Sequence, residues 1–175
     1  MIRDVVIGLD LATRTGFAVL DLDGKRLESG TWPLSPRAGR GKPDRWVRLR
    51  TALLELLSRY EGRIGVIACE RPFEHKGGKN KRSSASTPKV AWGLVALVEL
   101  TAEVRGLTVV LYPPKSCKLV FARSGNADKA AMVAEARRRW PAFDGPHDEA
   151  DGLAVAVTAL AKLDRAGLEC GEVRP

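Results

Sequence analysis

The sequence has few cysteines and no long apolar run. Its three cysteines, Cys69, Cys117 and Cys170, are odd in number and lack the spacing of zinc ligands, which indicates reduced thiols and disfavours a zinc site. No apolar segment approaches the length that crosses a membrane, and residues 5–9 are too few for the core of a secretory signal peptide. We therefore expect a cytoplasmic protein with no membrane association.

Acidic residues are scarce in two Gly-, Ser- and Pro-rich segments where basic residues gather. The 175-residue chain has a net charge of +8. Residues 34–50 hold six arginines and lysines against Asp44 alone, and residues 71–89 hold six against Glu74 alone. Such clusters favour a phosphate-backbone surface over charge kept for solubility. We expect one domain with a core over about 4–163, mobile basic loops at about 33–44 and 74–88, and a C-terminal tail at about 165–175.

The order of the predicted elements favours a mixed sheet covered by helices. Residues 4–21 predict two strands around a polar loop at 11–15, and 27–32 predict a third. Asp44 is expected to cap an amphipathic helix, and Asn126 or Asp128 to cap another that ends before Pro141. The remaining predictions are strands at 64–69 and 107–112, helices at 89–105 and 115–122, and a buried helix at about 148–163. Three consecutive strands followed by crossover units fit an α/β fold of the ribonuclease H-like kind, with five strands.

Four carboxylates stand where predicted strands end or where the last helix begins. Asp10 closes the first strand and Glu70 the fourth, while Asp148 and Asp151 share one face of the last helix. Loop capping is the alternative for Asp10, and N-capping accounts for one of the helical aspartates. Four clustered carboxylates repel one another, and oxygen ligands without His or Cys favour Mg²⁺ or Mn²⁺. Two such ions beside basic loops are typical of a nuclease.

Several motifs together resemble the RuvC family of Holliday junction resolvases. Residues 7–16, Ile-Gly-Leu-Asp-Leu-Ala-Thr-Arg-Thr-Gly, resemble its opening strand and loop, and residues 69–73, Cys-Glu-Arg-Pro-Phe, its second acidic motif. Residues 112–132 resemble the segment with two functional lysines, and residues 147–157 the final acidic helix. The resemblance, which covers about residues 5–160, implies a Mg²⁺-dependent endodeoxyribonuclease that resolves four-way DNA junctions by paired nicks. It implies two ions in each active site, with Mn²⁺ as a substitute.

The resemblance also implies roles for individual residues. Asp10, Glu70, Asp148 and Asp151 would bind the metal ions and, with Lys129, carry catalysis. The residues expected at DNA, from the resemblance or from the basic clusters, are Phe73, Arg71, Lys76, Lys79, Lys81, Arg82, Lys118, Arg40 and Lys42. Phe73 would stack on a base, with a core position as the alternative. Lys118 and Lys129 have simple phosphate contact or solvent exposure as alternatives, and His147 has either proton transfer or a surface position.

The implied partners are a four-way DNA junction, a second copy of the chain and a branch-migration helicase, with nucleoid association when DNA is bound. The helix at 89–105 is the candidate dimer interface, and ordinary covering of the sheet is its alternative. Leu11 and Ala12 replace the more usual Pro-Gly, and the loop after Phe73 is longer and more basic than in cellular bacterial members. These departures indicate a phage-type or otherwise divergent member.

Other functions remain as alternatives. An actin-like or sugar-kinase-like ATPase also opens with an Asp-containing strand, but it needs a second, duplicated domain that 175 residues cannot hold. A non-catalytic junction-binding or RNA-binding module would keep the basic loops but has no reason to keep four acids. Among nucleases, a relative that acts on forks, flaps or RNA–DNA hybrids is the principal alternative.

Overall fold

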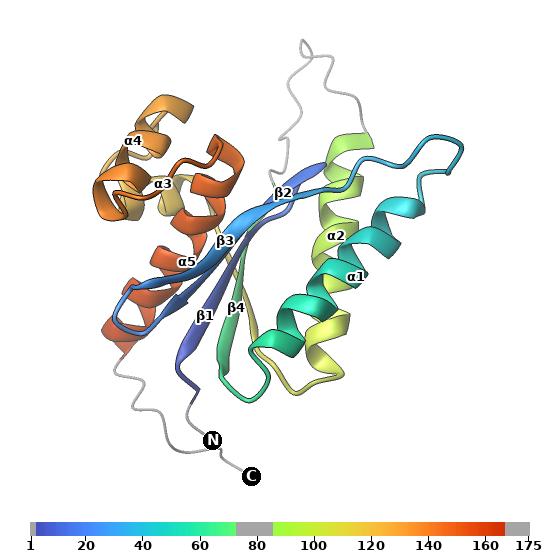
Figure 1. The fold of residues 1–175 in the computed structure, drawn as a ribbon, viewed down its shortest axis with the longest axis horizontal. Coiled ribbons are helices and arrows are strands. Elements are labelled where there is room, and N and C mark those ends of the chain that lie inside the picture. The colour runs from blue at the N-terminus through green and yellow to red at the C-terminus, as the bar shows by residue number, and fades with distance from the viewer. Residues whose placement is uncertain (1–2, 73–85, 167–175) are drawn as a thin grey trace.

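A five-stranded mixed sheet forms the centre of the molecule (Figure 1). The computed structural model describes residues 3–72 and 86–166. The spatial order of the strands is β3 (Arg26–Pro33), β2 (Arg14–Asp21), β1 (Val5–Asp10), β4 (Ile64–Glu70) and β5 (Val109–Tyr112). β2 pairs antiparallel with both β1 and β3, whereas β4 pairs parallel with both β1 and β5. The predicted α/β fold of the ribonuclease H-like kind is confirmed.

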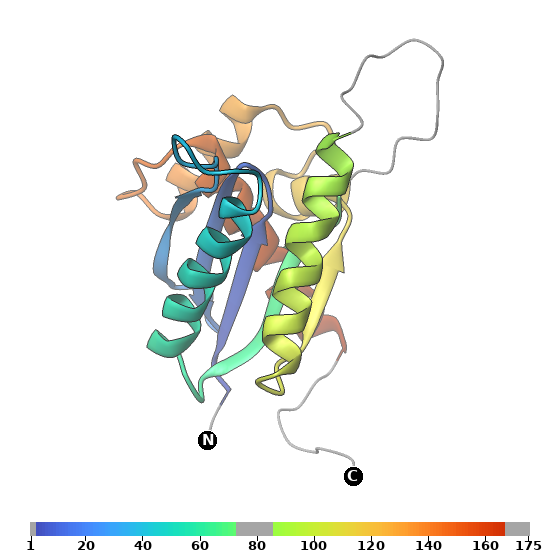
Figure 2. The ribbon, with the colours of Figure 1, turned by 90° about the vertical axis from the view of Figure 1, so that its right-hand side faces the viewer.

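Helices cover both faces of this sheet. α1 (Asp44–Arg59) and α2 (Ser86–Glu103) lie side by side on one face, and Figure 2 shows them in front of the strands. The other face carries α5 (His147–Ala166), together with α3 (Pro114–Ala122) and α4 (Lys129–Arg139). Within the described ranges, none of the helices combines the length and the apolar character needed to cross a membrane.

The central strand β1 contributes to two hydrophobic cores. Val5, Ile7 and Leu9 pack with α1 and α2, whereas Val6 packs with α3, α4 and α5. Successive side chains of a strand point to opposite faces, so a strand between two helical layers is apolar at nearly every position. This explains why the run before Asp10 is continuously hydrophobic.

One sequence-based boundary was wrong in an informative way. β2 begins at Arg14, inside the loop predicted at 11–15, because residues 14 and 15 continue the ladder with β3 opposite Pro33 and Trp32. The Thr15 hydroxyl is buried and donates to the carbonyl oxygen of Ala12 at 2.9 Å, which satisfies a polar side chain inside the sheet. The loop after Asp10 is therefore short and tied to β2.

The predicted helix caps had different outcomes. Asp128 caps α4, since its Oδ1 accepts from the backbone amide of Ala131 at 2.8 Å, which confirms one of the two candidates. The cap predicted for Asp44 is wrong. Asp44 is the first residue of α1 and makes no side-chain cap bond, because Arg37 binds its carboxylate.

Candidate active site

Asp10 and Glu70 lie side by side at one edge of the sheet. They are the last residues of β1 and β4, and the register that pairs Leu9 with Cys69 brings the two next positions together. Parallel strands end at the same edge, so their terminal side chains meet. Two carboxylates from segments 60 residues apart are thus brought together by strand pairing alone.

Glycines bring the start of α5 to the same edge. Gly16 pairs with Asp10 across the β1–β2 ladder, and a Cβ on Gly16 would lie 1.7 Å from the carbonyl oxygen of Asp148. From the other side, a Cβ on Gly152 would lie 2.7 Å from the carbonyl carbon of Gly16. Because only glycine leaves room for this backbone contact, the helix rests directly on the strand next to Asp10.

A cavity of about 650 Å³ opens at this junction. Asp10, Glu70 and Asp151 line it together with Lys118 and Arg71. The structure therefore brings three of the four predicted carboxylates to one cavity, with two predicted DNA-binding residues at its wall.

The fourth carboxylate, Asp148, points toward Arg14 and His147. Its Oδ2 lies 3.5 Å from Nε of Arg14, and its Oδ1 lies 3.2 Å from Nε2 of His147. It is still near enough to act on Asp10 electrostatically. Arg14 was not among the predicted site residues, because its contact with Asp148 joins segments 134 positions apart and has no local sequence signal.

Burial and mutual repulsion act on these acids. Burial raises the pKa of Asp10 well above its usual value, and the charges of Glu70, Asp151 and Asp148 raise it further. The pKa of Glu70 rises to about 7, mainly because the side chain is buried and also because the charge of Asp151 repels it. Burial also raises the pKa of Asp151, against the opposing charge of Lys118. Three acids in one cavity are thus poorly tolerated as anions without additional positive charge.

A hard divalent cation fits this set of donors. Within residues 3–72 and 86–166, no three His, Cys, Asp or Glu side chains are already gathered as a metal site. Nevertheless, the cavity acids offer only oxygen ligands, and burial and mutual repulsion raise the pKa values of Asp10 and Glu70. The chemistry of the donors therefore favours a hard ion such as Mg²⁺ or Mn²⁺.

The two predicted functional lysines flank the acids. Lys118 is partly buried, and its Nζ donates to the carbonyl oxygen of Ala127 at 2.8 Å while its charge acts on Asp10, Glu70 and Asp151. Lys129 is the first residue of α4, and its Nζ lies 2.8 Å from Nε2 of His147. Each lysine is therefore held by a partner that leaves ammonium hydrogens free for a further acceptor.

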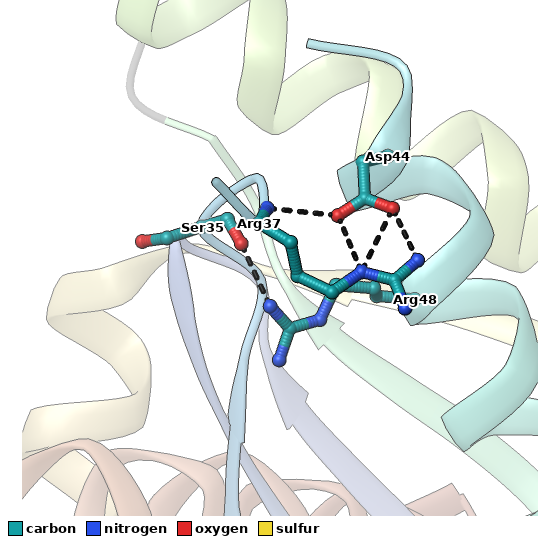
Figure 3. Close-up of polar contacts among 4 residues, drawn as sticks. All are labelled: Ser35, Arg37, Asp44 and Arg48. Atoms are coloured by element: carbon teal, nitrogen blue, oxygen red, sulfur yellow. Dashed lines mark hydrogen bonds and ion pairs between the residues drawn. The ribbon is translucent and has the colours of Figure 1, made fainter. Parts of the chain in front are cut away.

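The basic loop between β3 and α1 is fastened at both ends. The amide of Leu34 donates to the carbonyl oxygen of Thr13 at 2.7 Å, next to the loop that follows Asp10. At the other end, Asp44 accepts from the Arg37 amide at 2.9 Å and from its guanidinium, and Arg48 donates to the carbonyl oxygen of Ser35 (Figure 3). The bonds from Arg37 lower the pKa of Asp44 to about 2.

This loop leaves the sheet at the edge that carries the acids. β3 and β1 are both antiparallel to β2, so both end at the same edge. Arg40 and Lys42 are exposed in the loop. Other predicted DNA-binding residues, Phe73, Lys76, Lys79, Lys81 and Arg82, lie outside the described residues.

The raised pKa values predict how stability depends on pH without metal. A carboxyl with a raised pKa binds its proton more tightly in the folded chain, so its ionisation destabilises the fold as the pH rises through that pKa. For Glu70, a rise from 4.5 to about 7 corresponds to roughly 3 kcal/mol. In EDTA we expect the melting temperature to fall by several degrees between pH 5 and pH 8.

Mg²⁺ should cancel most of that fall, and Glu70→Gln should reduce it in EDTA. Differential scanning fluorimetry across this range checks both expectations. Asp44 and Glu135, whose pKa values are lowered to about 2 by arginine partners, lose their stabilising effect only in more acidic solution. A melting temperature in EDTA that stayed level or rose from pH 5 to pH 8 would contradict the prediction.

The sheet order, the covering helices and the carboxylates at the ends of β1 and β4 define an α/β protein with a ribonuclease H-like fold. No family model matches the chain. The crossover junction endodeoxyribonuclease RuvC of Anaeromyxobacter sp. (strain Fw109-5) is 35% identical over 170 residues, covering 93% of this chain and 75% of the relative. RuvC of Synechococcus sp. (strain RCC307) is 32% identical, covering 88% and 96%. The chain belongs to the RuvC family of crossover junction endodeoxyribonucleases.

Solved structures give the same result. T. thermophilus RuvC in complex with a Holliday junction substrate matches with a TM-score of 0.71 and 25% identity, covering 94% of this chain and 96% of that one. The yeast mitochondrial Holliday junction resolvase Ydc2 matches with a TM-score of 0.60 and 16% identity, covering 94% and 82%, which is a likeness of fold. The suspected resemblance to RuvC is confirmed.

Proposed function

We infer that this chain is a DNA endonuclease that resolves four-way junctions. Family membership and the likeness to a RuvC bound to a Holliday junction support this function. The observation that carries it is the cavity in which Asp10, Glu70 and Asp151 meet beside Lys118 and Arg71. Such a cavity joins oxygen ligands for a metal ion to positive charge for a phosphate.

We propose that the four acids bind two Mg²⁺ ions. Asp10, Glu70 and Asp151 would hold them inside the cavity, and Asp148 would turn from Arg14 to complete the set. When bound, the metal supplies Lewis-acid activation of the phosphodiester and of the attacking water. RuvC-family nucleases are metal-dependent in general, and Mn²⁺ offers the same preference for oxygen ligands.

The remaining charged groups act on the phosphate itself. Lys118 is held against Ala127 at the cavity wall and would donate its free ammonium hydrogens to the scissile phosphate. Lys129 would stabilise the charge that develops in the transition state. Arg71, whose amide is bonded to the carbonyl oxygen of Tyr112, would bind the adjacent backbone phosphate.

The function is tested by offering the purified chain a four-way junction, a fork, a plain duplex and an RNA–DNA hybrid of matched sequence. We expect symmetric paired nicks in the junction with Mg²⁺ and none with EDTA. Cleavage of the fork or hybrid that is faster than cleavage of the junction would identify that molecule as the preferred substrate. Tight junction binding without cleavage would instead identify a non-catalytic module.

We also propose that Arg40 and Lys42 contact DNA phosphates. Their loop is fastened to the Asp10 loop and to α1, which favours a fixed surface at the edge of the active site. Replacing both with alanine should lower the slope of log Kd against log salt by about 1.8, since each phosphate contact contributes about 0.9. Lys25→Ala with Lys162→Ala removes equal charge from the turn before β3 and from the C-terminal part of α5, and it should change the slope little. An unchanged slope in the loop variant would exclude the contact.

The outer face of α2 supports a homodimer. Leu94, Val95 and Val98 of this helix are buried against the sheet, whereas Trp92 and Leu100 on the opposite face are 37% and 63% exposed. Exposed apolar patches of this kind commonly mark protein interfaces. We propose that two chains pair through α2, which would give the two active sites that paired nicks require.

A branch-migration helicase is proposed as a further partner. As a DNA-acting enzyme, the protein would work in the cytoplasm, at the nucleoid.

Leu100→Glu should convert the proposed dimer to a monomer, because it introduces a charge into the exposed apolar patch of α2. Sedimentation equilibrium at micromolar concentration measures the change. Leu119→Glu is the matched control, since Leu119 is 57% exposed on α3, away from α2. The interface is wrong if Leu100→Glu still sediments as a dimer, or if the unaltered chain is already a monomer.

A further inference from the structure

Lys129 and His147 form a contact whose role the four acids do not explain. Lys129 opens α4 and His147 opens α5, so the contact links the first turns of two helices. The Lys129 Nζ lies 2.8 Å from the His147 Nε2, within ordinary hydrogen-bond distance. His147 directly precedes Asp148 in the acidic helix.

The chemistry of the two groups fixes the direction of the bond. A lysine ammonium has three donors and no acceptor, so the ring nitrogen of His147 must accept and its proton must be on Nδ1. The 3.2 Å approach of Nε2 to Asp148 Oδ1 is then a contact between two acceptors and not a hydrogen bond. The Nε2 lone pair is already used by Lys129, so it is not available to a metal ion.

An exposed lysine at a helix start samples many rotamers, and fixing one of them costs side-chain entropy. Lys129 is exposed, and His147 is the partner that the structure gives its ammonium. In this arrangement the cation is held beside the acidic turn, where its charge acts on Asp151. The other two ammonium hydrogens are left for an anion.

We propose that His147 is a positioning residue, which accepts a hydrogen bond from Lys129 and aims its ammonium at the phosphate that is cleaved. This inference rests on the proposed function of the site. It gives His147 a role through Lys129, separate from metal binding and from proton transfer.

A double-mutant cycle tests this role in the full-length chain. His147→Ala should slow single-turnover cleavage of a four-way junction by Mg²⁺-loaded enzyme about tenfold at saturating protein, as is typical when a catalytic group loses its alignment. Junction affinity and the Mg²⁺ concentration for half-maximal rate should stay within about twofold. His147→Gln should restore most of the rate, because its amide oxygen can also accept from an ammonium. Adding His147→Ala to Lys129→Met should cause no further loss.

A readout independent of activity is the ring tautomer. Long-range ¹H–¹⁵N NMR of the metal-free protein at pH 8 should find the His147 proton on Nδ1, and Lys129→Met should abolish that preference. A proton on Nε2 in the unaltered chain would overturn the proposal. Additive losses in the double mutant, or a Mg²⁺ requirement that shifts in His147→Ala, would overturn it as well.

The experiment distinguishes a wrong role for His147 from a wrong proposed function. If the unaltered chain cuts the junction and His147→Ala cuts equally fast, only the positioning role is lost. If the unaltered chain does not cut the junction, the proposed function and the role of His147 fall together. Thermal melting of each variant ensures that the rates compare folded proteins.

Discussion

Asp10→Asn is expected to reduce junction cleavage by at least about 10³-fold while leaving junction binding intact. Asparagine keeps the shape of the side chain but loses the charge that a divalent ion needs, and electrostatic groups at the reacting atoms commonly supply effects of this size. Asparagine also removes a buried carboxyl whose ionisation is opposed by burial and by the charges of Glu70, Asp151 and Asp148. The variant should therefore melt higher than the unaltered chain in EDTA.

A substitution that lowers cleavage but raises the melting temperature distinguishes a catalytic carboxylate from a structural one. A loop cap at Asp10 would lose stability on substitution, whereas a metal ligand held among acids gains it in the absence of metal. Junction binding is measured by fluorescence anisotropy in EDTA, and cleavage in Mg²⁺. Asp23→Asn, an exposed acid in the turn after β2, is the control for the charge change and should cleave normally. Full nicking activity in Asp10→Asn would remove it from the proposed metal ligands.

The sequence predicted those parts of the fold and of the site that local patterns encode. Continuous apolar runs identified β1 and β4, and each run ends at an acid, so strand pairing alone brings Asp10 beside Glu70. The spacing of Asp148 and Asp151 likewise follows from helical periodicity. These relations depend on near neighbours or on the rule that parallel strands end together.

Other features of the structure depend on contacts between distant segments. Asp44 looks like a helix cap, and only the path of the preceding loop brings Arg37 to its carboxylate. In the same way, Asp148 shares a helical face with Asp151, yet Arg14 on β2 draws its carboxylate aside. Capping and ion pairing compete for the same oxygens, and the sequence does not encode which partner is within reach.

The structure is needed to explain why position 16 is a glycine. A glycine inside a strand usually weakens it, so its presence indicates a close backbone approach. The approaching segment is the first turn of α5, more than 130 positions later, where Gly152 faces it in return. The two glycines set the distance between the β1–β2 ladder and the acidic helix.

Gly16→Ala should therefore destabilise the fold and disrupt the active site together. The added methyl group would lie 1.7 Å from the Asp148 carbonyl oxygen, and no side-chain rotation can relieve the clash, because the methyl position is fixed by the strand backbone and the oxygen belongs to the helix backbone. Overpacking of this severity costs about 3 kcal/mol, which should lower the melting temperature by roughly 6–12 °C. Gly65→Ala is the matched control, because its Cβ would meet the nearest atom, the Val5 carbonyl oxygen, at an ordinary 3.5 Å.

Cleavage should fall further than stability explains. To accept the methyl group, α5 must shift away from β2, and its first turn carries Asp148 and Asp151 away from Asp10. Single-turnover rates are compared at a temperature where both alanine variants are fully folded, so that only geometry differs. A Gly16→Ala protein that melts with Gly65→Ala and cuts as fast would mean that the helix and the strand are not in backbone contact. Loss of cleavage in a folded Gly16→Ala protein would instead support the conclusion that Gly16 and Gly152 hold the acidic helix beside Asp10.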